Sequence, residues 1–275
     1  MVLAHVLQKA IQRGLARIDA QMLLLNALGQ PIHDRAWLAL REANLLTPEE
    51  VSRFEALCER RLHHEPLAYI VGEKEFFGLT LRIDHRVLDP RPDTEILVEW
   101  ALQVIPPGAH LNVADLGTGS GAIALAIKSQ RPDCHVLAID QSPEAMDVAR
   151  LNAQRLGLAI DVRYGQWLAG LSESLDVVVS NPPYIAAGDP HLSRLHHEPL
   201  QALASGLDGL QDLRQIVAQA PAHLAPGGWL LLEHGHDQAP AVCVMLQKAG
   251  FVQVQSRPDL AGIARCSGGQ RPKLT

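Results

Sequence analysis

The sequence predicts an α/β fold in which a doubly wound, mostly parallel sheet of seven strands carries helices on both faces. From about residue 110 onward, short apolar runs alternate with segments of helical spacing. This alternation is typical of parallel strands joined by crossover helices. A glycine-rich turn follows the first apolar run, as in the ligand-binding half of such sheets. A small helical bundle and a β-hairpin are predicted ahead of this domain.

The glycine-rich turn lies in residues 111–121, Leu-Asn-Val-Ala-Asp-Leu-Gly-Thr-Gly-Ser-Gly. Its first six residues form a short apolar run with one acid, which is typical of a buried parallel strand. Gly117, Gly119 and Gly121 allow a tight turn and the close approach of a ligand to the backbone. The spacing Asp-x-Gly-x-Gly-x-Gly differs from the Gly-x-Gly-x-x-Gly that binds a pyrophosphate. Taken alone, the turn is also compatible with a purely structural role.

The remaining elements of the large domain, residues 91–275, follow from the same patterns. Strands are expected at 111–116, 135–140, 160–164, 175–180, 228–233, 251–255 and 263–266, and helices at 94–105, 120–130, 143–156, 209–224 and 238–249. Ser142 and Pro143 supply a cap and a first-turn proline. Pro226-Gly227-Gly228 is expected to end a helix before the fifth strand.

The first 66 residues are predicted to be helical. Apolar residues recur at three- and four-residue steps from Val2 to Leu28, which predicts an amphipathic helix. Residues 34–43 and 48–62 repeat the pattern, and Thr47 is the expected N-cap of the latter. This bundle either recognises a partner or caps the large domain. Residues 67–90 are expected to be a linker with a hairpin at 76–83.

Composition and charge exclude several classes of protein. The 275 residues are 47 % hydrophobic, which is enough for a full core and argues against disorder. A net charge of −6 argues against a general nucleic-acid binder. The four cysteines form no Cys-x-x-Cys and the histidines no His-Glu-x-x-His, so neither a disulfide framework nor a metal site is expected. Without a signal peptide or a membrane-length apolar run, a cytoplasmic protein that does not bind membranes is expected.

Two residues downstream of the glycine turn indicate a nucleoside ligand. Asp140 ends the second strand about twenty residues after the turn, where an acid accepts hydrogen bonds from both ribose hydroxyls. Its alternative role is to cap the following helix. Trp167 follows the third strand, where its ring can stack on an adenine. A core or surface tryptophan is the alternative interpretation.

The stretch Asn181-Pro182-Pro183-Tyr184 carries the most chemical information. It follows the fourth strand, at the sheet edge where doubly wound folds bind ligands. The two prolines fix φ, so their carbonyl groups have set directions. The side-chain oxygen of Asn181 and the carbonyl of Pro182 can each accept one hydrogen from an –NH₂ group. Tyr184 can lie flat against a planar substrate.

Together, these motifs resemble the class I S-adenosylmethionine methyltransferases that act on amino or amide nitrogen. The wider match is to the PrmC/HemK-type glutamine methyltransferases of peptide-chain release factors, and it covers nearly the whole chain. The motifs that carry it are Asp115–Gly121, Asp140, Arg91-Pro-Asp-Thr-Glu95, Asn181–Tyr184, Glu198-Pro199-Leu200 with Ala202-Leu203, Gly227-Gly228 and Leu231–Gly235.

The resemblance implies a Rossmann-like methyltransferase at 91–275, with residues 1–66 recognising the release factor. It implies S-adenosylmethionine as cofactor, class 1 release factors as protein substrate, and methylation of the glutamine of their Gly-Gly-Gln motif. The cofactor residues implied are Asp115, Gly117, Thr118, Gly119, Ser120, Gly121, Asp140, Gln166, Trp167 and Asn181. Asn181, Pro182 and Tyr184 are the expected catalytic residues, and the expected substrate-binding residues add Pro183, Arg91, Glu95 and Glu198. No metal and no stable nucleic-acid binding are expected, and we expect a monomer.

Two positions depart from the family pattern. Gln166 stands where an acid is usual, and its oxygen can still accept from an adenine amine, without charge. Asp89 stands where an aliphatic residue is usual, and the sequence offers no account of it.

Three other hypotheses stay open at this stage. The same tetrapeptide serves DNA adenine amino-methyltransferases, although these usually add a basic recognition region, and this acidic chain shows none. A non-catalytic, cofactor-binding regulator of translation is another possibility. Gly268-Gly269-Gln270 repeats the tripeptide that the family modifies. Coincidence is the simplest account of it, and self-methylation is the alternative.

Overall fold

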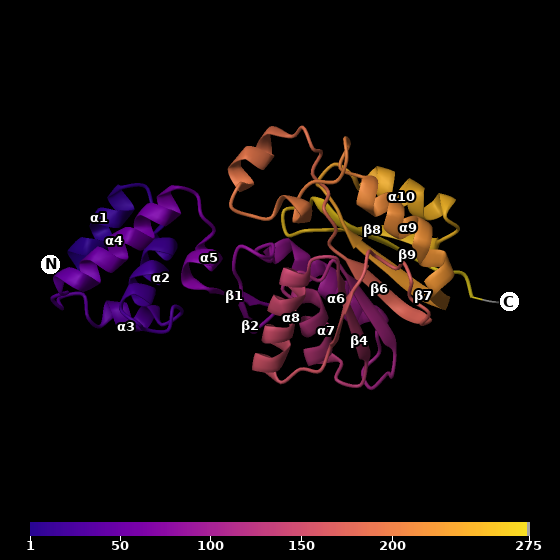
Figure 1. The fold of residues 1–275 in the computed structure, drawn as a ribbon, viewed down its shortest axis with the longest axis horizontal. Coiled ribbons are helices and arrows are strands. Elements are labelled where there is room, and N and C mark those ends of the chain that lie inside the picture. The colour runs from indigo at the N-terminus through magenta and orange to yellow at the C-terminus, as the bar shows by residue number, and fades with distance from the viewer. Residues whose placement is uncertain (274–275) are drawn as a thin grey trace. The chain divides into compact units, whose positions relative to one another are not determined.

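The computed structural model describes residues 1–273 and divides the chain into two compact units (Figure 1). The first comprises Met1–Glu73 and the second begins at Lys74. Each has its own hydrophobic core. Within residues 1–273, none of the helices combines the length and apolar character needed to cross a membrane.

The first unit is a bundle of helices around a core that includes Leu23, Leu24 and Phe54. The helices are α1 (Leu3–Gln12), α2 (Arg17–Ala27), α3 (Arg35–Ala39), α4 (Pro48–Leu62) and α5 (Leu67–Val71). Helix α4 has the predicted bounds because Thr47 caps it. The Thr47 hydroxyl accepts from Glu50 N, and the Glu50 carboxylate accepts in turn from Thr47 N.

The prediction of one helix from Val2 to Leu28 was wrong, because the chain forms two. Helix α1 ends at Gln12, and Gly14 has a φ of +104°, which the right-handed helix does not allow. The apolar periodicity survives the break because Leu15 is still buried. The helix predicted over 34–43 is also shorter, at Arg35–Ala39.

The predicted hairpin is confirmed. Strands β1 (Glu73–Phe76) and β2 (Leu79–Arg82) pair in a two-stranded sheet. Phe77 and Gly78 form the turn, and both have positive φ, at +50° and +74°. A two-residue turn with both central φ values positive matches the twist of the strands that it joins.

The second unit contains the predicted seven-stranded sheet. Its strands are β3 (Asn112–Leu116), β4 (His135–Asp140), β5 (Asp161–Tyr164), β6 (Leu175–Ser180), β7 (Leu224–Glu233), β8 (Val252–Pro258) and β9 (Ala264–Gln270). They lie in the order β5-β4-β3-β6-β7-β9-β8, and β9 is antiparallel to both of its neighbours. All other pairs are parallel.

Helices cover both faces of this sheet (Figure 1). They are α6 (Glu95–Val104), α7 (Ala122–Gln130), α8 (Pro143–Leu156), α9 (Gln211–His223) and α10 (Ala239–Lys248), with short 3₁₀ turns at Pro92–Thr94, Pro190–Leu195 and Leu200–Ala202. Helices α9 and α10 pack on the face that carries Val178 and Leu232. Helices α6, α7 and α8 lie on the opposite face.

One boundary was predicted wrongly around Pro226-Gly227-Gly228. This tripeptide lies inside β7 and does not end a helix, because α9 stops at His223 and β7 starts at Leu224. The register between β6 and β7 shifts there, which indicates a bulge. Proline and glycine are tolerated in a strand at such an irregularity.

The strand order changes direction at β3, which fixes where a ligand can bind. Strands β4 and β5 lie on one side of β3, and β6 and β7 on the other. The crossover helices therefore leave in opposite directions. A crevice opens at the carboxyl ends of β3, β4 and β6, where the glycine turn, Asp140 and Asn181 are found.

Candidate active site

A cavity of about 670 Å³, partly open to solvent, lies at this crevice. It is lined by the glycine turn, the ends of β4, β5 and β6, and two further segments. Its lining residues are Arg86, Val87, Leu88, Gly117, Gly119, Asp140, Gln141, Ser142, Ala145, Gly165, Gln166, Trp167, Asn181, Pro183, Pro199, Gln201 and Ala202.

The backbone of the glycine turn is fixed to the end of β4. Gly117 N and Thr118 N both donate to Ile139 O, at 2.8 and 3.0 Å. Gly119 N donates to Asp140 Oδ2 at 2.9 Å. Gly117 has a φ of +70°, and a β-carbon there would meet the Trp167 ring at 3.3 Å. Glycine is therefore needed at 117 both for the turn and for the packing of the tryptophan.

Four predicted cofactor residues, Asp115, Thr118, Ser120 and Gly121, shape the turn but are not among the lining residues. The fully buried carboxylate of Asp115 accepts from Thr118 Oγ1 at 2.6 Å and from Ala124 N at 3.1 Å. Burial raises the pKa of Asp115 to about 7. These contacts tie the turn to the first residues of α7.

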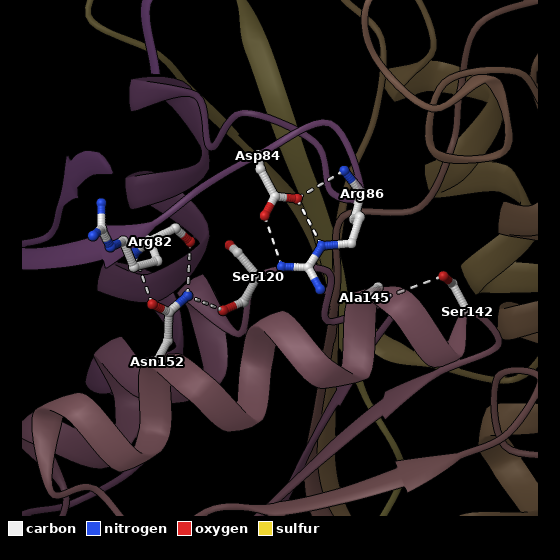
Figure 2. A network of polar contacts seen from close by, with 7 residues as sticks. All are labelled: Arg82, Asp84, Arg86, Ser120, Ser142, Ala145 and Asn152. Atoms are coloured by element: carbon white, nitrogen blue, oxygen red, sulfur yellow. Dashed lines mark hydrogen bonds and ion pairs between the residues drawn. The ribbon is translucent and has the colours of Figure 1, made fainter. Parts of the chain in front are cut away.

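Asn152, which the sequence analysis missed, holds the turn from the other side (Figure 2). Its Nδ2 donates to Ser120 O at 2.9 Å and to Arg82 O at 3.0 Å, and its Oδ1 accepts from Arg82 N at 2.7 Å. One buried side chain of α8 thus connects the glycine turn to hairpin strand β2. No local signal reveals this role, because an asparagine inside a helix is ordinarily a surface residue.

Arg86, also missed, lines the cavity close to the N-terminus of α8. Its guanidinium is held by Asp84, with Nε to Oδ1 at 2.8 Å and Nη2 to Oδ2 at 2.7 Å. This two-point contact raises the pKa of Arg86 and lowers that of Asp84. The pair orients the segment that leads from the hairpin to Leu88.

The structure brings Asp140, Gln166 and Trp167 together around the cavity as the sequence predicted. Asp140 Oδ1 accepts from Ser142 N at 2.9 Å, and Ser142 itself caps α8. Burial raises the pKa of Asp140. These oxygens accept from the backbone of Gly119 and Ser142, and a carboxylate, with about four lone-pair sites, can accept further hydrogen bonds. Trp167 presents its ring beside Gly117.

A second cavity of about 390 Å³ adjoins the first. It is lined by Leu88, Arg91, Asn181, Tyr184, Ile185, Leu195, Ala202 and Leu203. Leu88, Asn181 and Ala202 line both cavities. Asn181 therefore lies on the boundary that the two cavities share.

The side chain of Asn181 is fixed by a hydrogen bond to a buried neighbour. Its Nδ2 donates to the buried Thr94 Oγ1 at 3.2 Å, an amide orientation assigned from this hydrogen bond. The preceding residue, Ser180, donates to Leu116 O at 2.7 Å, which locks the ends of β6 and β3 together. Tyr184 donates to Glu233 Oε1 at 3.4 Å, and burial raises its pKa. The tetrapeptide is therefore anchored at both ends.

Four charged side chains lie at and behind the wall of the second cavity. Arg91 Nη2 contacts the buried Glu198 Oε1 at 2.5 Å, and its Nη1 lies 3.4 Å from Asp89 Oδ2. Lys74 Nζ lies 3.4 Å from Asp89 Oδ1. The two buried acids are thus matched by two cations. This arrangement explains how an acid is accommodated at position 89.

The other predicted substrate residues are distributed differently. Pro183 lines the first cavity, whereas Pro182 is buried and is not among the lining residues of either cavity. Glu198 supports Arg91, and Glu95 accepts from Phe77 N at 3.0 Å, so Glu95 contacts the hairpin turn. Neither glutamate is among the lining residues of the two cavities. Within residues 1–273, no group of three or more His, Cys, Asp and Glu side chains is arranged to bind a metal ion.

The tail tripeptide Gly268-Gly269-Gln270 lies inside β9, between β7 and β8. Gln270 Nε2 donates to Gly227 O at 2.8 Å. A glutamine amide that is hydrogen-bonded within a paired strand is not free to enter the cavities of its own chain, which argues against self-methylation of the folded protein.

Comparison with known proteins agrees with this geometry. The family model described as "PrmC N-terminal domain" matches residues 2–72, and that described as "Methyltransferase small domain" matches residues 92–256. The release factor glutamine methyltransferase of Xylella fastidiosa (strain Temecula1) is 47 % identical over 267 residues, which cover 96 % of each chain. The chain belongs to the release factor glutamine methyltransferase family.

Another relative confirms the family across the whole length. The release factor glutamine methyltransferase of Burkholderia pseudomallei is 49 % identical over 265 residues, 93 % of this chain and 92 % of the relative. Among solved structures, a methyltransferase from Pyrococcus furiosus superposes with a TM-score of 0.56 at 20 % identity. It covers 78 % of this chain and 98 % of its own. At that identity the match shows the class I methyltransferase fold alone.

Proposed function

We propose that this enzyme transfers a methyl group from S-adenosylmethionine to the side-chain amide nitrogen of the glutamine in the Gly-Gly-Gln motif of class 1 peptide-chain release factors. The observation that carries the proposal is the place of Asn181 on the shared boundary of two adjoining cavities. A donor in the first cavity and an acceptor side chain in the second would meet at this residue.

The first cavity fits the proposed cofactor. The positive φ values of Gly117 and Gly119 leave room close to the backbone, and the Asp140 carboxylate keeps lone pairs for ribose hydroxyls. Gln166 and Trp167 would contact the adenine, the tryptophan by stacking. When bound, S-adenosylmethionine supplies an electrophilic methyl group on a sulfonium leaving group.

The second cavity fits a glutamine side chain. An amide nitrogen is a poor nucleophile because its lone pair is delocalised into the carbonyl. The Asn181 oxygen and the Pro182 carbonyl would each accept one amide hydrogen, which rotates the nitrogen lone pair out of conjugation. The same acceptors would stabilise the positive charge that grows on nitrogen as the methyl–sulfur bond breaks, and one N–H proton would then leave to water. Tyr184 would pack on the amide plane and help to hold it in line for attack.

The proposal also assigns roles to the parts of the chain. Residues 1–66 would recognise the release factor, residues 67–90 would form the linker, and residues 91–275 would carry out the transfer. The separate core of the helical unit and the match of residues 2–72 to the family's N-terminal model support a distinct N-terminal part, but this unit extends to Glu73, so α5 belongs to it and not to the linker. We propose a monomer that works in the cytoplasm, where release factors act on ribosomes, without stable nucleic-acid binding.

The proposal is tested by incubating the purified protein with radiolabelled S-adenosylmethionine and a purified class 1 release factor, followed by mass spectrometry of its peptides. One methyl group on the glutamine of Gly-Gly-Gln is expected. A release factor with that glutamine replaced by alanine should stay unlabelled. Label on adenine in duplex DNA, with none on the release factor, would contradict the proposal.

A further inference from the structure

The carboxyl group of Glu233, at the end of β7, lies behind the Asn181–Tyr184 stretch. Glu233 is 2 % exposed and lines neither cavity. The Tyr184 hydroxyl donates to its Oε1 at 3.4 Å, and the Thr94 hydroxyl lies close enough to favour its charged form. Glu233 therefore lies beside Thr94, which contacts Asn181, and beside Tyr184, which ends the Asn181–Tyr184 stretch. Because it lines neither cavity, Glu233 does not contact a ligand itself.

The intermediate residue, Thr94, sets a direction for this network. A hydroxyl has one hydrogen to donate and two lone pairs to accept with. An ionised carboxylate can only accept, so the hydrogen of Thr94 points toward Glu233. The lone pairs of Thr94 Oγ1 then face Asn181, which must present its –NH₂ group at the observed 3.2 Å.

This direction decides which end of the Asn181 amide faces the cavities. The two ends of an asparagine amide have nearly the same shape, so packing alone does not distinguish them. The acceptor oxygen of Thr94 does distinguish them, because only the –NH₂ end can donate a hydrogen bond to it. We propose that Glu233 is a positioning residue that, through Thr94, holds the oxygen of Asn181 toward the boundary of the two cavities. This inference rests on the proposed function, in which that oxygen accepts from the substrate amide.

The surroundings of Glu233 make its charge a specific feature of the site. Burial and the nearby Asp93 oppose the ionised form, whereas the hydroxyls of Thr94 and Tyr184 and the guanidinium of Arg265 favour it. Burial raises the pKa of Glu233 to about 7, and its Oε2 has no hydrogen-bond partner among residues 1–273. A buried acid with an unsatisfied oxygen destabilises the fold. A neutral apolar residue would avoid this cost, which argues that the acceptor has a role.

The experiment compares Glu233→Gln, Thr94→Val and Thr94→Ser with the wild type, using a class 1 release factor as substrate. Glu173→Gln and Thr80→Val are the matched controls, since Glu173 and Thr80 lie outside both cavities. We expect kcat to fall ~10–100-fold in Glu233→Gln and Thr94→Val, the scale of a misplaced catalytic group. The KM for S-adenosylmethionine and the Tm should change little, and Thr94→Ser, which keeps the hydroxyl, should retain most of kcat.

Two further measurements separate positioning from a general loss of structure. The double variant Thr94→Val/Glu233→Gln should be no slower than either single variant, because both interrupt one network. The dissociation constant of a Gly-Gly-Gln peptide should rise in both single variants when measured with S-adenosylhomocysteine present. The wild-type kcat should also rise with pH through about 7 as Glu233 ionises, and Glu233→Gln should lose that rise.

The inference would be overturned if Glu233→Gln kept the wild-type kcat and the wild-type affinity for the peptide. It would also be overturned if the losses of kcat in the double variant were fully additive. A fall in kcat explained by a matching fall in Tm would overturn it as well. A wild-type enzyme that leaves the release factor unmethylated would instead refute the proposed function, so the two failures are distinguishable.

Discussion

Arg91 and Glu198 meet at 2.5 Å although 107 residues separate them in the chain. Glu198 also accepts from Asp89 N at 3.4 Å. The segment that follows Asn181–Tyr184 is thereby fastened to the segment that precedes α6. Because Arg91 lines the second cavity, this ion pair fixes one wall of the proposed glutamine site.

Glu198→Gln should therefore weaken both the fold and the binding of the protein substrate. Loss of a charged acceptor whose side chain is 2 % exposed is expected to lower the free energy of unfolding by ~1–3 kcal/mol. Chemical denaturation and the KM for the release factor measure the two effects. Asp89→Asn is the comparison. A smaller effect is expected because Asp89 lies farther from Arg91 than Glu198 does, at 3.4 Å. Equal losses in the two variants would contradict this ranking.

Asp140→Asn should weaken the cofactor without slowing the chemistry. The amide oxygen can replace only one acceptor of a carboxylate that already serves Gly119 N and Ser142 N. Loss of one or two charge-assisted hydrogen bonds should raise the Kd of S-adenosylmethionine ~10–100-fold. Calorimetry gives the Kd, and kcat at saturating cofactor should stay near the wild-type value. A large fall in kcat with an unchanged Kd would remove Asp140 from the ribose site.

Gly117→Ala should impair cofactor binding through Trp167. The φ of +70° costs ~1–2 kcal/mol of stability for alanine, and its β-carbon would lie 3.3 Å from the tryptophan ring. Gly157→Ala is the matched control, because Gly157 has a similar φ of +65° and open space around it. Both variants should lose Tm, but only Gly117→Ala should raise the Kd of S-adenosylmethionine. A normal Kd in Gly117→Ala would show that the Trp167 ring is not part of the adenine site.

The elements that the sequence predicted best are those with local signals. Strands β4 and β6 and helix α8 have the expected bounds, because an uninterrupted apolar run or a Ser-Pro start marks each of them. Asp140 and Asn181 were identified because Asp140 ends one such strand and Asn181 directly follows another. The break at Gly14 was missed since the apolar periodicity continues across it.

The parts of the site that the sequence did not reveal depend on contacts between distant segments. Asn152 reaches Arg82 across 70 positions, and Tyr184 reaches Glu233 across 49. Neither pair has a characteristic spacing, because the topology of the sheet brings the residues together. Asp89 illustrates the same limit, since its cationic neighbours become apparent only in the folded chain.

The pH dependence of stability should carry the signature of Asp115. Its pKa is raised to about 7 in the folded protein, whereas an unfolded aspartate ionises near 4. The folded state therefore binds a proton more tightly, so this group stabilises the fold fully below pH ~4 and loses that contribution as the pH rises to ~7. Asp115→Asn cannot ionise. Its stability relative to the wild type should increase from pH 5 to pH 7.5 in denaturant titrations, and a constant difference would contradict the raised pKa.

Asn181→Ala tests the central geometry most directly. Alanine removes the oxygen proposed to accept from the substrate amide and also the –NH₂ group that contacts Thr94. Since that acceptor acts on charge that develops during transfer, kcat should fall by ~10²-fold or more. The Kd of S-adenosylmethionine should stay nearly unchanged, because the proposed cofactor contacts are made mostly by the glycine turn and Asp140, which line the first cavity.

The matched control for this variant is Asn112→Ala. Asn112 begins β3, at the end of the strand opposite to the glycine turn, and donates to Ser174 O. It should keep the wild-type kcat. If Asn181→Ala instead lost cofactor affinity as strongly as turnover, Asn181 would act chiefly by holding the cofactor, and the acceptor for the glutamine amide would have to be sought elsewhere on the wall that it shares with Leu88 and Ala202.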